Sequence, residues 1–151
     1  MAEPVPLHAV ESVYAQRLRE LTSQDWQLLK GALERVQTAE SFGHWVPSVR
    51  LADASWQMPY AVLSSDVEEL MRTWGALGLY IPFEWPAWAA GRALARDPGE
   101  LEVATPAEAA MLIVAVVRSN RFIEGELLES FENGLIQRAV RRVLSAERGE
   151  S

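Results

Sequence analysis

Residues 105–117 read TPAEAAMLIVAVV, and this stretch decides the fold of the chain. Thr105 suits a helix N-cap, Pro106 the first helical position, and Glu108 the acidic position of a capping box. Every residue from Ala109 to Val117 is apolar, so the predicted helix has no polar face and must be buried. Its β-branched residues leave a buried strand as the alternative. The capping box and the length favour the helix, which we place at the centre of the fold.

Apolar residues at helical spacing predict further helices on both sides of this segment. The predicted helices cover roughly residues 7–21, 23–36, 65–77, 85–96, 124–132 and 135–145. Ser23 is expected to cap the second of these, and Ser65 with Glu68 to form the capping box of the third. Residues 41–58 lack a sustained period and are expected to be irregular, with short extended pieces around Val49 and Leu51.

The predicted fold is all-α: one compact domain over residues 1–151, with six or seven helices around the central apolar helix and little or no sheet. A length of 151 residues fits one domain, and a hydrophobic share of 49% supplies a core. Residues 146–151 are expected to form a frayed tail.

The composition excludes several classes of site. The chain has no cysteine, so disulfides, thiolate catalysis and cysteine-bound zinc are excluded. It has no phosphate-binding loop, no dinucleotide fingerprint, no zinc-protease motif and no nucleophile elbow. Because His8 and His44 are the only histidines and lie in different predicted elements, we expect no metal and no cofactor.

Charge and hydropathy indicate the kind of partner and the cellular compartment of the chain. A net charge of −7 makes nucleic acid an unlikely partner and argues against anionic lipid. The longest apolar run, Ala109 to Val117, is far shorter than the roughly 20 residues that a membrane span needs. With no secretory signal at residues 1–7, the sequence predicts a cytoplasmic protein without membrane contact.

Three pieces of the second half resemble a known family. They are MPY at residues 58–60, YIPFEW at 80–85 with Trp88 after it, and RSNRF at 118–122 followed by Gly125 and Gly134. In this order and spacing they resemble the bacterial family catalogued as domain of unknown function 6508, over roughly residues 58–144. The family often has aspartate where this chain has Glu84. The first 50 residues add nothing to the resemblance, which implies fold continuity across the second half and no particular activity.

The segment after the central helix is the predicted site. Arg118 and Arg121 lie three residues apart, so they share a face if the helix continues. Guanidinium groups at the edge of a core suit carboxylate or phosphate, with Glu124 close by and the backbone N–H groups at Gly125 assisting. The alternative is that both arginines have only a structural role. Cations at a helix C-terminus are favoured by the macrodipole alone, and Arg121 can pair with Glu84 or Glu124.

Aromatic and basic residues extend this prediction. Trp85 and Trp88 lie one helical turn apart and can line a ligand pocket beside the arginines, or can fill the core. A further stripe of Arg138, Arg141 and Arg142 is expected to face outward, either toward an acidic partner or simply toward solvent.

We therefore expect a small intracellular binding or interaction module for an anionic small molecule or an acidic protein segment. Its predicted ligand-binding residues are Glu84, Trp85, Trp88, Arg118, Arg121 and Glu124. One alternative is a structural subunit without a ligand, such as a homodimer. A further alternative is an enzyme in which Glu84 or Glu124 acts as general base.

Overall fold

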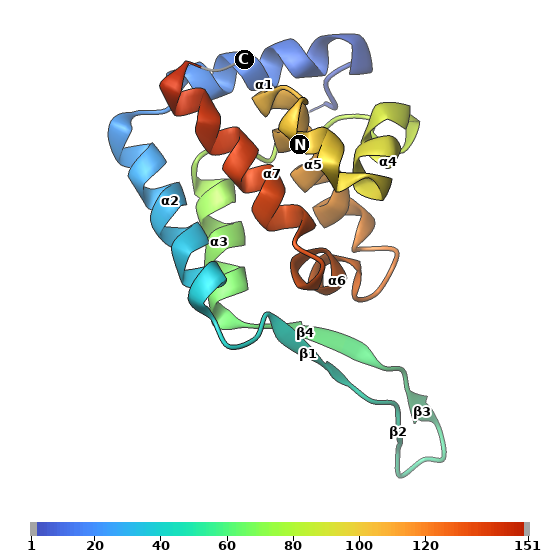
Figure 1. Ribbon diagram of the computed structural model, residues 1–151. Coiled ribbons are helices and arrows are strands. Elements are labelled where there is room, and N and C mark those ends of the chain that lie inside the picture. Colours follow the sequence, from blue (N-terminus) through green and yellow to red (C-terminus); the bar gives the residue numbers. More distant parts are fainter. Residues whose placement is uncertain (1–2, 150–151) are drawn as a thin grey trace.

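The computed structural model describes residues 3–149, and most of this part of the chain is helical (Figure 1). Its α-helices are α1 (Leu7–Glu20), α2 (Ser23–Thr38), α3 (Ser65–Ala76), α4 (Ala89–Arg96), α5 (Pro106–Ser119), α6 (Glu126–Glu132) and α7 (Leu135–Leu144). Short 3-10 helices are η1 (Trp85–Ala87), η2 (Pro98–Glu102) and η3 (Ser145–Arg148). The predicted all-α fold with little sheet is confirmed.

The central apolar segment forms helix α5, as its capping box predicts. Thr105 Oγ1 accepts a hydrogen bond from the backbone N–H of Glu108 at 3.0 Å, and Glu108 Oε1 accepts one from the N–H of Thr105 at 3.0 Å. Most of the side chains of α5 are buried, and the helix packs against α1, α4, α6 and α7. The alternative of a buried strand is therefore wrong.

Helix α7 connects this centre to the rest of the body. It packs against α5 on one side and α2 on the other, while α2 packs against α3. The largest fully buried side chains are Trp74 of α3, Tyr14 of α1 and Phe131 of α6. One continuous core thus joins the two halves of the chain.

Two helix starts differ from the prediction by one residue. Thr22, not Ser23, caps α2 and forms a capping box with Asp25. Ser64, not Ser65, caps α3, and its hydroxyl accepts the N–H of Val67. In each case the capping residue has the extended backbone that an N-cap requires, while the following serine is already helical.

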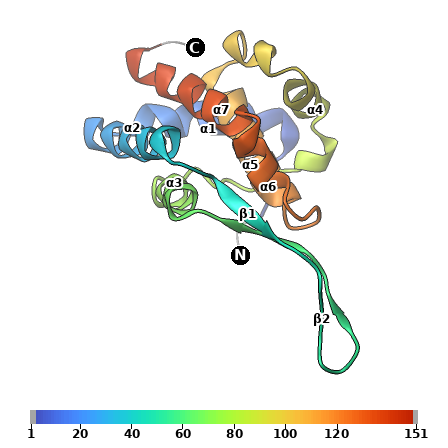
Figure 2. The ribbon, with the colours of Figure 1, turned by 60° about the horizontal axis from the view of Figure 1, so that its bottom comes forward.

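A β-hairpin arm, residues 43–63, occupies most of the stretch that we expected to be irregular, and the short extended piece expected around Val49 is part of it. Strand β1 (Gly43–Val46) pairs antiparallel with β4 (Tyr60–Leu63), and β2 (Val49–Arg50) pairs with β3 (Trp56–Gln57). Figures 1 and 2 show the arm projecting away from the helical body. The strands are only two to four residues long and none of their residues is buried, so they lack the alternation of buried and exposed residues by which a strand is predicted.

The C-terminal end makes contacts with the helical body. Residues 145–148 form η3, Ala146 packs against the core, and Glu147 forms an ion pair with Lys30 of α2. The first residues of the predicted frayed tail thus lie against the body, and fraying there stays a prediction. Residues 150–151 of the predicted tail lie outside the described part of the chain.

Candidate functional site

The six predicted site residues do not converge on one cavity. Trp85 and Trp88 line a cavity together. The two arginines and the two glutamates line none of the cavities described here. The helix that was expected to align Arg118 and Arg121 ends at Ser119, and the N–H of Arg121 turns back to the carbonyl of Arg118 at 3.2 Å. The α-helix therefore does not continue through Arg121.

Arg118 lies near two phenols on the inner side of the body. Burial raises the pKa of Tyr14 and Tyr80, and the positive charge of Arg118 partly offsets this effect on both. The Tyr14 hydroxyl donates to the carbonyl of Leu79 at 3.1 Å and accepts the N–H of Ile81 at 3.1 Å. Arg118 is half-buried in this setting, whereas Arg121 is exposed.

Neither predicted glutamate forms an ion pair with an arginine within residues 3–149. Glu84 is exposed, and its side chain makes no capping hydrogen bond to η1. Glu124 instead accepts a hydrogen bond at Oε1 from the backbone N–H of Ala61 in β4, at 3.1 Å. The structural alternative, in which Arg121 pairs with Glu84 or Glu124, is thus not seen within residues 3–149. Neither candidate general base lines a described cavity.

Residues 119–125 form a socket for the arm. Gly125 has a left-handed backbone with φ of +83°, and a Cβ added there would lie 2.0 Å from Cζ2 of Trp45 in β1. The Trp45 ring thus packs directly on the glycine, beside the hydrogen bond from Ala61 to Glu124. The segment that the sequence suggested as an anion site instead fixes the base of the hairpin.

The tryptophan cavity has a volume of about 250 Å³ and lies between α4, α5 and the start of α6. Trp88 is buried and packs edge-on against Phe83, with ring centroids 5.8 Å apart. Glu126 also lines the cavity, and its Oε2 is buried without a hydrogen-bond partner. The arginine beside the tryptophans is Arg92, whose guanidinium donates to the carbonyl of Pro86 at 2.6 Å.

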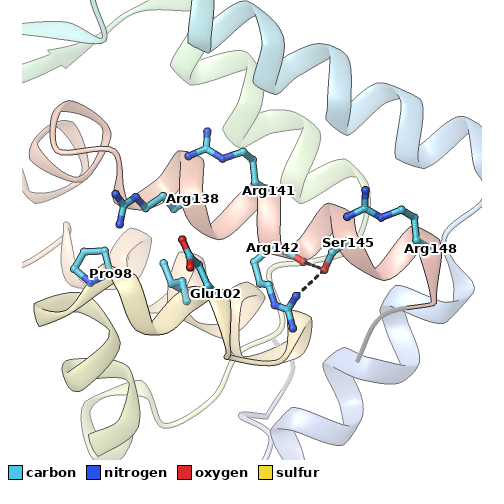
Figure 3. A pocket seen from close by; sticks show the side chains of 8 residues that line it. Pro98, Glu102, Arg138, Arg141, Arg142, Ser145 and Arg148 are labelled. Carbon is cyan, nitrogen blue, oxygen red and sulfur yellow. Dashed lines mark hydrogen bonds between the residues drawn. The ribbon is translucent and has the colours of Figure 1, made fainter.

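The arginine pocket is larger, about 450 Å³, and lies between η2 and the α7–η3 segment (Figure 3). It is lined by Pro98, Leu101, Glu102, Arg138, Arg141, Arg142, Ser145 and Arg148. Four of these eight residues are arginine and one is acidic, in a chain whose net charge is −7. Positive charge is therefore concentrated at one place on an otherwise acidic molecule.

The arginines of this pocket differ in how they are held. Arg142 Nε donates to the carbonyl of Ala104 at 2.6 Å, and one terminal nitrogen reaches Ser145 Oγ at 3.4 Å. Figure 3 shows the Arg142 side chain on the side of α7 away from the guanidinium of Arg141. The side chains of Arg138 and Arg141 are exposed and have no hydrogen bond or ion pair within residues 3–149. The guanidinium groups of Arg138 and Arg141 are thus free to bind a ligand, whereas that of Arg142 is held by the carbonyl of Ala104.

The sequence contained only part of the pattern that defines this pocket. The stripe of Arg138, Arg141 and Arg142 is visible in the sequence, and the structure places Arg138 and Arg141 outward as expected. The expectation is wrong for Arg142, which is half-buried because its guanidinium reaches back to the carbonyl of Ala104. Nothing in the sequence shows that η2 lies against α7, or that Arg148 continues the stripe on a 3-10 turn. The pocket arises from this tertiary contact.

The described part of the chain has neither a metal-ligand cluster nor a membrane-spanning helix. No group of three or more histidine, aspartate or glutamate residues there is arranged to hold a metal ion. No helix within residues 3–149 is both long enough and apolar enough to cross a bilayer.

Comparison with known proteins gives one match. A family described as "Family of unknown function (DUF6508)" matches residues 21–149. The match begins well before residue 58, where the recognisable motifs start, so it includes α2, the arm and the arginine pocket. No curated protein and no solved structure matches the chain.

Proposed function

We propose that this chain, which belongs to the family of unknown function DUF6508, is a small binding module that holds a multiply charged anion in the arginine pocket. The observation that carries the proposal is the gathering of four arginines around one depression of about 450 Å³. A pocket of this size matches the usual range for small-molecule sites, roughly 300–1,000 Å³.

Arginine suits this role because its planar guanidinium offers two parallel N–H donors to a carboxylate or phosphate. Arg142 provides a donor group whose position is set by Ala104 and Ser145. Arg138 and Arg141 exchange their hydration for contacts with the ligand. The net charge of −7 disfavours a long polyanion such as nucleic acid, so the proposed ligand is a small anion or a short acidic protein segment.

The setting that we propose is the cytoplasm of a bacterium. A chain of 151 residues without cysteine is compatible with a reducing compartment.

Thermal unfolding with added anions tests the proposal. Pyrophosphate, a nucleoside triphosphate, a tricarboxylate and a poly-glutamate peptide are titrated at low salt. A ligand that binds only the folded state raises the melting temperature progressively with its concentration. At least one of these anions should do so, and added salt should weaken the effect because the contacts are charge-assisted.

Matched variants separate the pocket from general charge effects. Arg138→Gln/Arg141→Gln should abolish the ligand-dependent rise. Arg72→Gln/Arg96→Gln removes the same charge from exposed positions outside the pocket and should keep it. The proposal fails if no anion shifts the wild type, or if both double variants respond to the anion like the wild type.

A further inference from the structure

The arm carries most of the large apolar side chains that the described chain exposes. Of eleven such residues six lie within residues 43–63, and they are Trp45, Val49, Leu51, Trp56, Met58 and Tyr60. Trp56 is 63% exposed and Met58 74% exposed. Single exposed apolar residues are ordinary, but a concentration of this kind on one projecting element marks an interaction surface.

This apolar surface continues onto the body at the socket. Phe122 is 79% exposed and Ile123 58% exposed, and both lie in the segment on which Trp45 packs. Phe122 also lies beside Trp85, with ring centroids 6.3 Å apart. The molecule thus presents an apolar arm and, at the base of that arm, an apolar surface on the body.

The arm lacks the support that a hairpin normally has. Each of its two sheets contains only two strands, so both edges of the ribbon lack a third strand. A two-stranded hairpin alone is at best marginally stable in water. Glu124 satisfies one outward N–H of β4, at Ala61 near the base. Beyond this contact and the packing of Trp45 on Gly125, the strand edges and the other exposed apolar side chains of the arm are available to a partner.

Charge indicates which partner fits. Arg50 and Asp53 are the only charged residues within residues 43–63 and they cancel, whereas the whole chain carries −7. Two copies of this chain repel each other through their acidic bodies but not through their arms. Because the arm projects from the body, two arms can meet while the bodies stay apart (Figures 1 and 2). A strongly charged partner would find no complementary charge on the arm.

We propose that the arm is covered by a second copy of this chain, in a two-fold dimer built from the two hairpins and the apolar residues at their bases. A two-fold interface uses the same surface patch on both subunits. Each copy must therefore carry both the arm and the apolar residues at its base, and each copy of this chain carries both. The dimer is independent of the arginine pocket, which lies between η2 and the α7–η3 segment, away from the arm and the socket.

Sedimentation velocity and light scattering from micromolar to millimolar concentration test the dimer. The wild type should pass from monomer to dimer with increasing concentration. Trp56→Ser/Met58→Ser should weaken dimerisation by about tenfold or more, because large apolar residues dominate interface energies. Leu28→Ser/Val103→Ser removes two exposed apolar side chains elsewhere and should leave dimerisation unchanged. A monomeric wild type at all concentrations, or equal effects of the two double variants, overturns the proposal.

A cross-linking measurement tests the interface with the apolar residues of the arm unchanged. Since the chain has no cysteine, Ser48→Cys places a single thiol on the arm and Ser12→Cys a single thiol on α1. Both positions are exposed. A short bis-maleimide should convert Ser48→Cys to covalent dimers in much higher yield than Ser12→Cys. Equal yields contradict an interface at the arm.

Discussion

Gly125 and Gly134 have the same left-handed backbone, with φ of +83°, but only Gly125 lies under an aromatic ring. A side chain in this conformation costs about 1–2 kcal/mol. At Gly134 nothing lies within 4 Å of an added Cβ, so this cost stands alone. At Gly125 the Cβ also displaces the Trp45 ring.

We therefore expect Gly134→Ala to lower the free energy of unfolding by about 1–2 kcal/mol and Gly125→Ala to lower it by at least about 1 kcal/mol more. Urea denaturation of the two variants measures the difference. Hydrogen exchange at Ala61 should accelerate only in Gly125→Ala, because its N–H depends on the socket. Equal destabilisation by the two alanines would contradict the packing of Trp45.

The ionisation of Tyr14 is strongly coupled to folding. Burial raises its pKa above the ordinary value of 10.0, so the folded state favours the neutral phenol. The stability that this contributes is fully present below pH 10 and is lost as the pH rises above it.

The free energy of unfolding should thus decrease as the pH rises above about 10. Tyr14→Phe should cost about 1–2 kcal/mol at neutral pH through the lost hydrogen bonds, and should show a shallower decrease at high pH. Exposed Tyr60→Phe serves as the control, with a decrease like that of the wild type. Denaturant titrations at several pH values provide the measurement, and identical slopes in all three proteins would rule out this coupling.

At the scale of the element, helix starts depend on which residue has the extended backbone. Ser64 caps α3 in the structure, although the sequence suggested Ser65. Ser64→Ala should lower the free energy of unfolding by about 1 kcal/mol. Ser65→Ala lies at the first helical residue and should change it by less than about 0.5 kcal/mol. If thermal denaturation shows that Ser65→Ala destabilises the protein more than Ser64→Ala, then Ser65 is the N-cap of α3.

The elements that the sequence predicted are those specified by local contacts. The capping box of Thr105 and Glu108 acts over three residues, so α5 was predictable in type and starting residue. The arm was not predictable in this way. Its base pairs Gly43 with Leu63, twenty residues apart, and its exposed strands leave no alternation.

The six predicted site residues do not meet in one cavity for a related reason. Arg118 and Arg121 were assumed to share one helix face, but α5 ends between them. The arginine pocket needs η2 against α7, which is a contact that no local pattern specifies. The residue types thus indicated the chemistry of a site. Which of these residues lie together depends on tertiary packing, which local sequence patterns do not specify.

At the scale of the whole molecule, the helical body and the arm are separable. The buried core contains no residue from 44 to 62, and the paired ends Gly43 and Leu63 already lie side by side. Replacing residues 44–62 with a short glycine-rich turn should leave helical circular dichroism and cooperative unfolding intact. The same deletion should abolish dimerisation and preserve anion binding. Loss of cooperative folding would show that the body depends on the arm.

The uneven exposure of the tryptophans has a practical consequence. Trp26, Trp74 and Trp88 are buried, Trp85 is half-buried, and Trp45 and Trp56 of the arm are exposed. A water-soluble quencher such as iodide should reach the indoles of the arm and spare those of the interior. The native emission spectrum can therefore follow events at the hairpin in real time, without a dye.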